Sequence, residues 1–156
     1  MNEALLPILE PQGTDQEMID ALKRETFEYF IKGVHPKTGL ICDSTQPDAP
    51  ASIAVMGLAL SCYVVATENG WISRPEALER TLTILRFFHS SHQGPEKDAT
   101  GYKGFYYHFL DIEGGGRAWK SELSTIDTAI LMAGVLTAAE YFSRDHNGEA
   151  EIRRIA

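Results

Sequence analysis

The sequence predicts an all-α protein built from helical hairpins that stack in two layers, and three observations lead to this prediction. Helical segments with a single apolar stripe alternate along the chain with helical segments that carry no charge on any face. Glycine, asparagine, serine and proline stand where these segments begin and end. The composition, 44% hydrophobic and 23% charged over 156 residues, is typical of one globular domain.

The first helix is predicted from about residue 15 to residue 32. Thr14 or Asp15 can cap its start, and one face carries the residues Ile19, Leu22, Thr26 and Phe30. Residues 1–14 are predicted to be an extension that precedes the helical domain of residues 15–156. The acids and the proline of this extension do not fit the basic, apolar order of a secretory signal, so the sequence leaves the location open.

The second helix is predicted from about residue 51 to Glu68, which is its first charged residue, and it ends at Asn69-Gly70. Its uncharged stretch approaches the length of a membrane span, but it includes several polar residues and lacks flanking basic anchors. The sequence therefore predicts a buried helix that is covered on all sides.

The same pair of helix types then occurs a second time. Ser73 is predicted to cap an amphipathic helix with a proline in its first turn, and its apolar stripe consists of Leu78, Leu82, Leu85 and Phe88. Ser124 is predicted to cap a fourth helix that is uncharged from residue 128 to residue 139. We expect the amphipathic helices in an outer layer and the apolar helices in an inner layer.

A plain four-helix bundle is the alternative architecture. Two wholly apolar helices with only two amphipathic partners would leave apolar flanks in water, so further helices are expected. A new helical pattern begins after Asn147-Gly148 and continues to the last residue, Ala156. We therefore predict four helices and the start of a fifth, either as the amino-terminal portion of a larger helical toroid or with self-association through exposed apolar helix faces.

An aromatic segment between the third and fourth helices has a different pattern. Phe105, Tyr107 and Phe109 alternate with Tyr106, His108 and Leu110, and the glycine run 114–116 supplies a turn. The sequence predicts a short aromatic β-hairpin over one end of the helices. Such a hairpin can be plain packing or the wall of a sugar site, and Trp119 can pack against it or stack on a sugar ring.

Carboxylates precede both apolar helices. Asp43 and Asp48 precede the second helix and Glu122 precedes the fourth, and the alternating direction of the helices is expected to bring both loops to one end. Each aspartate also fits ordinary turn chemistry, and Asp127 fits a capping role with Ser124. Glu122 has no capping role, and contact with Trp119 would bias it toward its protonated form.

Two carboxyl groups with different environments are what glycoside hydrolysis requires. One donates a proton to the leaving oxygen, and the other activates water or attacks carbon. An inverting enzyme needs a separation of about 6.5 to 9.5 Å between them, which leaves room for the water. Loops from two neighbouring inner helices can provide that gap, so this geometry permits catalysis without establishing it.

Several other functions find no support in the sequence. The net charge of −8 argues against nucleic acid and anionic membrane surfaces as partners. Cys42 and Cys62 lack zinc-site spacing and are predicted to be small buried hydrophobic residues. The histidines form no pattern, and no phosphate loop, dinucleotide fingerprint or nucleophile elbow occurs, so no metal or cofactor is expected.

The combination of motifs resembles the bacterial glucoamylase-like family that includes the endo-β-1,2-glucanases. The resemblance rests on TGLICDST, DAPASIAVMGLAL, NGWISRPEALERTLTILRFF, GFYYHFLDIEGGGRAW and SELSTIDTAILMAGVLTAAEYF, in this order. It implies an (α/α)6 toroid and a glycoside hydrolase that acts on a β-linked glucan, with β-1,2-glucan favoured. A complete toroid has twelve helices, so little activity is expected from these 156 residues alone.

The resemblance also implies roles for individual residues. Glu122 matches the candidate general acid, and Asp43 and Asp48 match aspartates of the same catalytic cluster. Three residues of the aromatic segment would line the sugar subsites, and Asp127 is a further candidate contact; the three are Tyr107, His108 and Trp119. A glucan-binding or chain-length-controlling module without hydrolysis, and a helical interaction domain, remain the alternatives.

Overall fold

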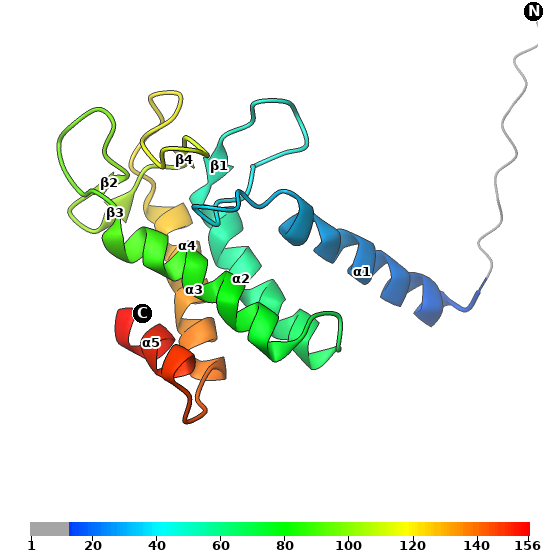
Figure 1. The fold of residues 1–156 in the computed structure, drawn as a ribbon. Helices are drawn as coiled ribbons and strands as arrows, with labels where there is room; N and C mark the ends of the chain where they lie inside the picture. Colours follow the sequence, from blue (N-terminus) through cyan, green and yellow to red (C-terminus); the bar gives the residue numbers. More distant parts are fainter. Residues whose placement is uncertain (1–12) are drawn as a thin grey trace, which may run out of the picture.

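The computed structural model describes residues 13–156, and most of this part of the chain is helical (Figure 1). The predicted extension therefore lies almost wholly outside the described residues. The elements in chain order are α1 (Asp15–Lys32), β1 (Ala51–Ser52), α2 (Ile53–Glu68), α3 (Arg74–Ser90), β2 (Gly101–Tyr102), β3 (Phe105–Tyr106), β4 (Phe109–Leu110), α4 (Thr125–Tyr141) and α5 (Asn147–Ile155). The predicted helices are present, and the prediction of a mostly helical fold is confirmed.

The inner helices α2 and α4 touch along their backbones. A methyl group added to Gly57 would lie 2.2 Å from the carbonyl oxygen of Ile130, and one added to Gly134 would lie 2.2 Å from the carbonyl oxygen of Gly57. Met56, Leu60 and Leu131 on the same two helices are completely buried. Small residues at the crossing thus allow a close approach, and larger apolar residues around it fill the core.

The outer helix α3 buries one stripe, as predicted. Leu82, Leu85 and Phe88 of this stripe are buried, and Leu78 is partly buried. The Ser73 side chain caps the helix by accepting from the N–H of Glu76, which satisfies a backbone donor that the helix itself cannot. Helix α3 is therefore an outer-layer helix with one buried face, as its amphipathic pattern predicts.

Helix α1 is covered much less than its pattern suggests. Figure 1 shows it running outward from the other helices. Phe27 is buried and packs against Tyr63 and Trp71, at ring-centroid distances of 6.4 and 5.7 Å. Ile19 and Leu22 on its apolar face remain 47% and 64% exposed. The helix is thus anchored near its carboxyl end.

The aromatic segment forms two small antiparallel sheets, so the prediction of a single hairpin is correct only in part. Strands β2 and β3 make a hairpin around Lys103 and Gly104, both of which have positive φ. Strand β4 pairs instead with β1, about 58 residues earlier in the chain. Local alternation along residues 105–110 could not reveal this long-range pairing, which divides the segment between two partners.

Some expectations about burial are wrong. The inner helices are not covered on all sides, since large apolar side chains of both helices are at least half exposed: Leu58, Val65, Ile126 and Leu136. Cys42 and Cys62 are half-buried rather than buried, and both are free thiols. Across residues 13–156, no helix combines the length and apolar character needed to cross a membrane.

Candidate active site

The loops that precede the two inner helices lie at the same end of the molecule, as predicted (Figure 1). A short backbone ladder connects them. The Ile53 N–H donates to the carbonyl oxygen of His108, and the His108 N–H donates to the carbonyl oxygen of Glu122, at 3.2 and 3.0 Å. On the other side of β1, Cys42 forms a β-bridge with Ala51. The start of the loop that carries the two aspartates is therefore joined to the segment that carries Glu122.

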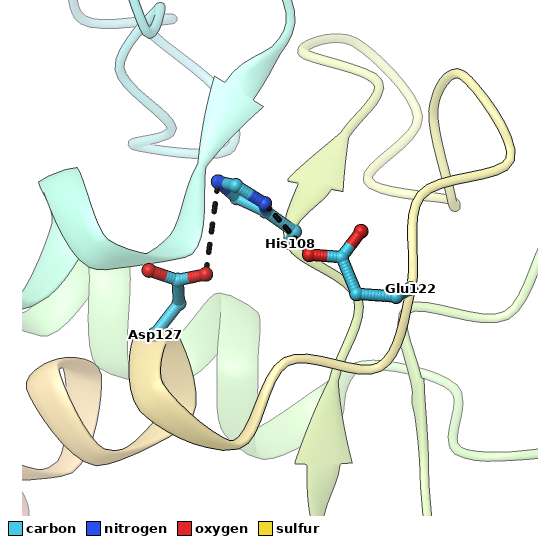
Figure 2. A group of neighbouring side chains, drawn as sticks. All are labelled: His108, Glu122 and Asp127. Atoms are coloured by element: carbon cyan, nitrogen blue, oxygen red, sulfur yellow. Dashed lines mark hydrogen bonds and ion pairs between the residues drawn. The ribbon is translucent and has the colours of Figure 1, made fainter.

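His108 lies between two carboxylates at this end (Figure 2). Its Nδ1 atom is 3.0 Å from Oε1 of Glu122, and its Nε2 atom is 3.6 Å from Oδ2 of Asp127. The exposed fractions of the three side chains are 30% for His108, 67% for Glu122 and 14% for Asp127. The imidazole also stacks on Phe109, with 3.9 Å between ring centroids and 14° between planes.

Asp127 has the capping role that the sequence predicts. The Ser124 hydroxyl donates to Oδ2 of Asp127 at 2.6 Å, and its oxygen accepts from the Asp127 N–H at 3.2 Å. A carboxylate in the first turn of α4 is also favoured by the partial positive charge of the helix amino terminus. The cap therefore fixes the carboxylate that faces His108.

The ionisation of Glu122 is opposite to the prediction. Its pKa is lowered, first by a hydrogen bond from its own backbone N–H and then by the His108 side chain, with Arg117 adding a smaller favourable charge. The Trp119 ring packs against Phe109 at 5.2 Å between centroids. Glu122 is largely exposed, so burial raises its pKa too little to favour the protonated form.

Trp119 stands on a tight turn. Trp119 and Lys120 both have positive φ, 53° and 54°, and the Ser121 N–H donates to the carbonyl oxygen of Ala118 at 2.9 Å. These features match a type I′ turn, in which glycine and asparagine are the usual central residues. Arg117 secures the turn by donating to the carbonyl oxygens of Ser121 and Lys120, at 2.5 and 2.8 Å. The turn holds the indole 70% exposed.

Tyr107 does not fit its predicted role as a sugar contact. Its side chain is only 8% exposed, and the guanidinium of Arg117 lies over its ring at 4.4 Å from the centroid. Its N–H donates to the carbonyl oxygen of Thr100. The residue therefore packs beneath the loop, against Arg117.

Asp43 and Asp48 lie on the neighbouring loop and are not part of the His108 cluster. Both side chains are exposed. The backbone N–H of Asp43 donates to the carbonyl oxygen of Pro50 at 2.7 Å, and Asp48 has a positive φ of 59°, which aspartate tolerates in turns. Beside this loop an open hollow of about 500 Å³ lies against α1, with Tyr29 and Cys42 in its wall.

The cluster also brings together three potential metal ligands, which the sequence did not predict. One potential metal-ligand atom from each of His108, Glu122 and Asp127 lies within 4.8 Å of the others. However, the two carboxylates face opposite ring nitrogens, whose lone pairs diverge, so one ion cannot use both contacts. Within the cluster, His108 and Glu122 form a hydrogen bond at 3.0 Å, whereas the contact of 3.6 Å between His108 and Asp127 is too long for one. Only the spacing of His108 and Glu122 across the glycine turn could have suggested this hydrogen bond.

Comparisons with known proteins find similar sequences and folds. No family model matches the chain. An exo-β-1,2-glucooligosaccharide sophorohydrolase from Parabacteroides distasonis is 27% identical over an alignment of 152 residues, which covers 90% of this chain and 19% of that protein. The chain thus spans about a fifth of the length of this curated relative.

Two solved structures have similar folds. A candidate glucoamylase from Bacteroides uniformis matches with a TM-score of 0.79 and 26% identity, over 94% of this chain and 35% of that one. A β-1,2-glucanase from Parabacteroides distasonis matches with a TM-score of 0.78 and 25% identity, over 92% of this chain and 20% of that one. The predicted resemblance is therefore confirmed: in sequence and in fold, this chain is similar to part of the helical toroid of glucoamylase-like glycoside hydrolases.

Proposed function

We propose that this chain supplies part of the active site of a glycoside hydrolase that acts on a β-linked glucan, with β-1,2-glucan favoured. One observation carries the proposal: Glu122 is held by His108 at the rim where an inner helix begins, beside an exposed tryptophan. The relatives named as β-1,2-glucan hydrolases support the choice of substrate. The whole enzyme would need the further helices that complete a toroid.

Glu122 provides one of the two carboxyl groups, and Asp43 or Asp48 provides the other. In an inverting mechanism, one group protonates the leaving oxygen while the other activates a water molecule on the opposite face of the sugar. Glu122 is the general acid by resemblance, but its lowered pKa favours the carboxylate in the free chain. It can donate a proton once a bound sugar excludes water, because desolvation raises the pKa of a carboxyl group.

Trp119 provides a platform for a sugar ring. Its indole is exposed and projects from a turn that Arg117 holds in place. An indole offers a large, flat apolar face to stack on a sugar ring, at low conformational cost. Trp119 and Lys120 have positive φ, which is unfavourable for residues with side chains, and such conformations are common at functional sites.

The test is hydrolysis of β-1,2-glucan by the complete protein that contains this chain. Glu122→Gln should abolish release of reducing ends, because a glutamine can neither donate nor accept the reaction proton. Glu113→Gln is the matched control, since Glu113 is an exposed glutamate of a neighbouring loop outside the cluster. Unchanged turnover in Glu122→Gln, or equal losses in both variants, would refute the role of Glu122.

The second candidate is a glucan-binding or chain-length-controlling module without hydrolysis. The exposed, ionised Glu122 favours this function for the chain by itself. Calorimetry with β-1,2-glucooligosaccharides distinguishes the two: binding that depends on Trp119, with no reducing ends released by the complete protein, would support the module.

Whether the chain belongs to a hydrolase or to a binding module, we expect its exposed apolar faces to pack against another part of a protein. Ile19, Leu22 and Val65 line an open groove of about 460 Å³ between α1 and α2, together with Phe30 and Trp71. Contiguous apolar surface of this kind marks a contact with another part of an assembly. The remaining helices of a toroid would cover it in the whole enzyme, and the isolated chain should self-associate through it.

A further inference from the structure

His108 is fixed more firmly than the carboxylate that it contacts. Its backbone N–H and carbonyl oxygen are both used in the ladder between Ile53 and Glu122. Its ring stacks on Phe109, and its two nitrogens face Glu122 and Asp127 (Figure 2). Glu122, by contrast, is 67% exposed and has no other side-chain partner within hydrogen-bonding distance among residues 13–156. The imidazole is thus the fixed group that can orient the exposed carboxylate.

The hydrogen-bonding capacity of His108, Glu122 and Asp127 determines which contacts the imidazole can make. An ionised carboxylate only accepts hydrogen bonds, whereas a neutral imidazole has one N–H and one accepting nitrogen. The Nδ1 atom of His108 lies within hydrogen-bond distance of Glu122, at 3.0 Å, whereas Nε2 is 3.6 Å from Asp127, beyond that range. The Oδ2 atom of Asp127 accepts from the Ser124 hydroxyl, so the cap of α4 fixes the carboxylate that faces Nε2 of His108.

We infer that His108 is a positioning residue, which orients the Glu122 carboxylate at the rim through its Nδ1 atom, while Asp127 faces the opposite ring nitrogen. The titratable or charged groups that face Glu122 are His108 and Arg117, and those that face His108 are Glu122 and Asp127. The catalytic meaning of this arrangement rests on the proposed hydrolase function, whereas the ionisation of Glu122 can be measured without it.

Two substitutions separate the two ring nitrogens. In His108→Asn, the amide nitrogen is bonded to Cγ, as Nδ1 is, so a donor toward Glu122 can remain. In His108→Gln, the amide nitrogen lies one bond further out, near the position of Nε2, so the donor toward Glu122 is lost and one toward Asp127 can remain. Both replace the imidazole by a neutral amide, so the pair tests whether the hydrogen bond to Glu122 itself matters.

The experiment is a carbon-13 NMR titration of the Glu122 carboxyl group in the 156-residue chain. We expect the pKa of Glu122 to rise in His108→Gln and to rise less in His108→Asn, with the amide spectra otherwise preserved. The matched control is His92→Asn, which removes the exposed His92–Glu96 pair at 2.8 Å and should raise the pKa of Glu96 but leave that of Glu122 unchanged. An unchanged Glu122 titration in folded His108→Gln would overturn the inference.

Activity of the complete protein supplies a second readout. A higher Glu122 pKa moves the alkaline limb of the pH–rate profile upward if Glu122 acts when protonated, and moves the acid limb upward if it acts when ionised. Either shift supports the positioning role, and a loss of kcat with both limbs unmoved contradicts it. If the unmodified protein hydrolyses no glucan, the proposed function fails, while the NMR titration still decides the role of His108.

Discussion

Trp119 and Lys120 lie in a turn whose backbone conformation is unfavourable for residues with side chains. Both residues have positive φ, a conformation that costs a side-chain-bearing residue about 1 to 2 kcal/mol. Arg117 compensates for part of this cost through two hydrogen bonds to the turn. The arrangement therefore favours display of the indole over local stability.

Replacement of Lys120 by glycine should therefore stabilise the chain. We expect the free energy of unfolding in urea to rise by up to about 1 kcal/mol, because glycine adopts positive φ without strain. Lys97→Gly is the control: Lys97 is exposed and does not have positive φ, so glycine there should destabilise by about 0.5 kcal/mol through lost backbone entropy. Equal effects at both positions would show that the turn is unstrained.

The sequence named Glu122, Asp127 and His108 as candidate site residues but did not predict the contacts among them. Glu122 was identified because it had no capping role, and Asp127 because it stands three residues after Ser124. The link through His108 depends on a turn that returns the chain to residue 122 and on β4 pairing with β1. Neither contact is local, so residue types and spacing could not reveal it.

The crossing of α2 and α4 determines the position of the inner layer. Gly57 and Gly134 bring the two backbones together, and neither position has room for a further carbon atom. Gly134→Ala should destabilise the chain by about 3 kcal/mol, since the new methyl group forces the helices apart. Thermal unfolding measures the loss. Thr137→Ala, at an exposed position of the same helix, should have little effect, and a similar loss there would contradict the packing explanation.

Helix α5 is held to α3 and α4 by a buried ion pair. The Arg74 guanidinium donates to both carboxylate oxygens of Glu149, at 2.8 and 2.9 Å, and to the carbonyl oxygen of Tyr141 at 2.9 Å. The Glu149 side chain is only 4% exposed and also accepts from the Arg144 N–H. Removal of one partner would leave a buried charge without compensation.

Glu149→Ala should therefore cost about 3 kcal/mol of stability at neutral pH. The Arg74 hydrogen bonds lower the pKa of Glu149, so its contribution is complete above the ordinary value of 4.5 and is lost as the pH falls through the lower value in the folded chain. Urea unfolding at several pH values should show less acid dependence in the variant. The control is Glu151→Ala, whose partner Arg86 is 58% exposed and whose effect should be below about 1 kcal/mol.

Helix starts were predicted well because their signals are local. Thr14, Ser73 and Ser124 each accept a backbone hydrogen bond from the residue three positions later, as a cap requires. Strand β1 was assigned instead to the start of the second helix, because Ala51-Ser52 is apolar and uncharged like the residues that follow. Its partner is β4, so only tertiary structure distinguishes the strand from the helix.

For the whole molecule, the alternation of amphipathic and apolar segments predicted a mostly helical, layered fold, and part of a larger toroid as one of two ways to cover it. It also indicated that the chain needs further cover, and the structure agrees, since apolar side chains of α1, α2 and α4 remain exposed. The position of α1 could not be predicted, because its stripe indicates that one face is to be covered but not by which helix. In residues 13–156 only the part near Phe27 finds partners.

The isolated chain should therefore self-associate, and charge on its exposed apolar faces should prevent this. Leu22 on α1 and Leu136 on α4 are 64% and 66% exposed, so Leu22→Glu and Leu136→Glu change the surface without disturbing the core. A carboxylate buried at a contact carries a large desolvation cost, which opposes association. In sedimentation velocity, the sedimentation coefficient of the unmodified chain should increase with concentration, and that of the variants should increase less.

Thr137→Glu is the control, because it adds the same charge at an exposed polar position next to Leu136. An equal decrease in association there would indicate general repulsion between charged chains. A chain that is monomeric at every concentration would show that these faces do not bind one another.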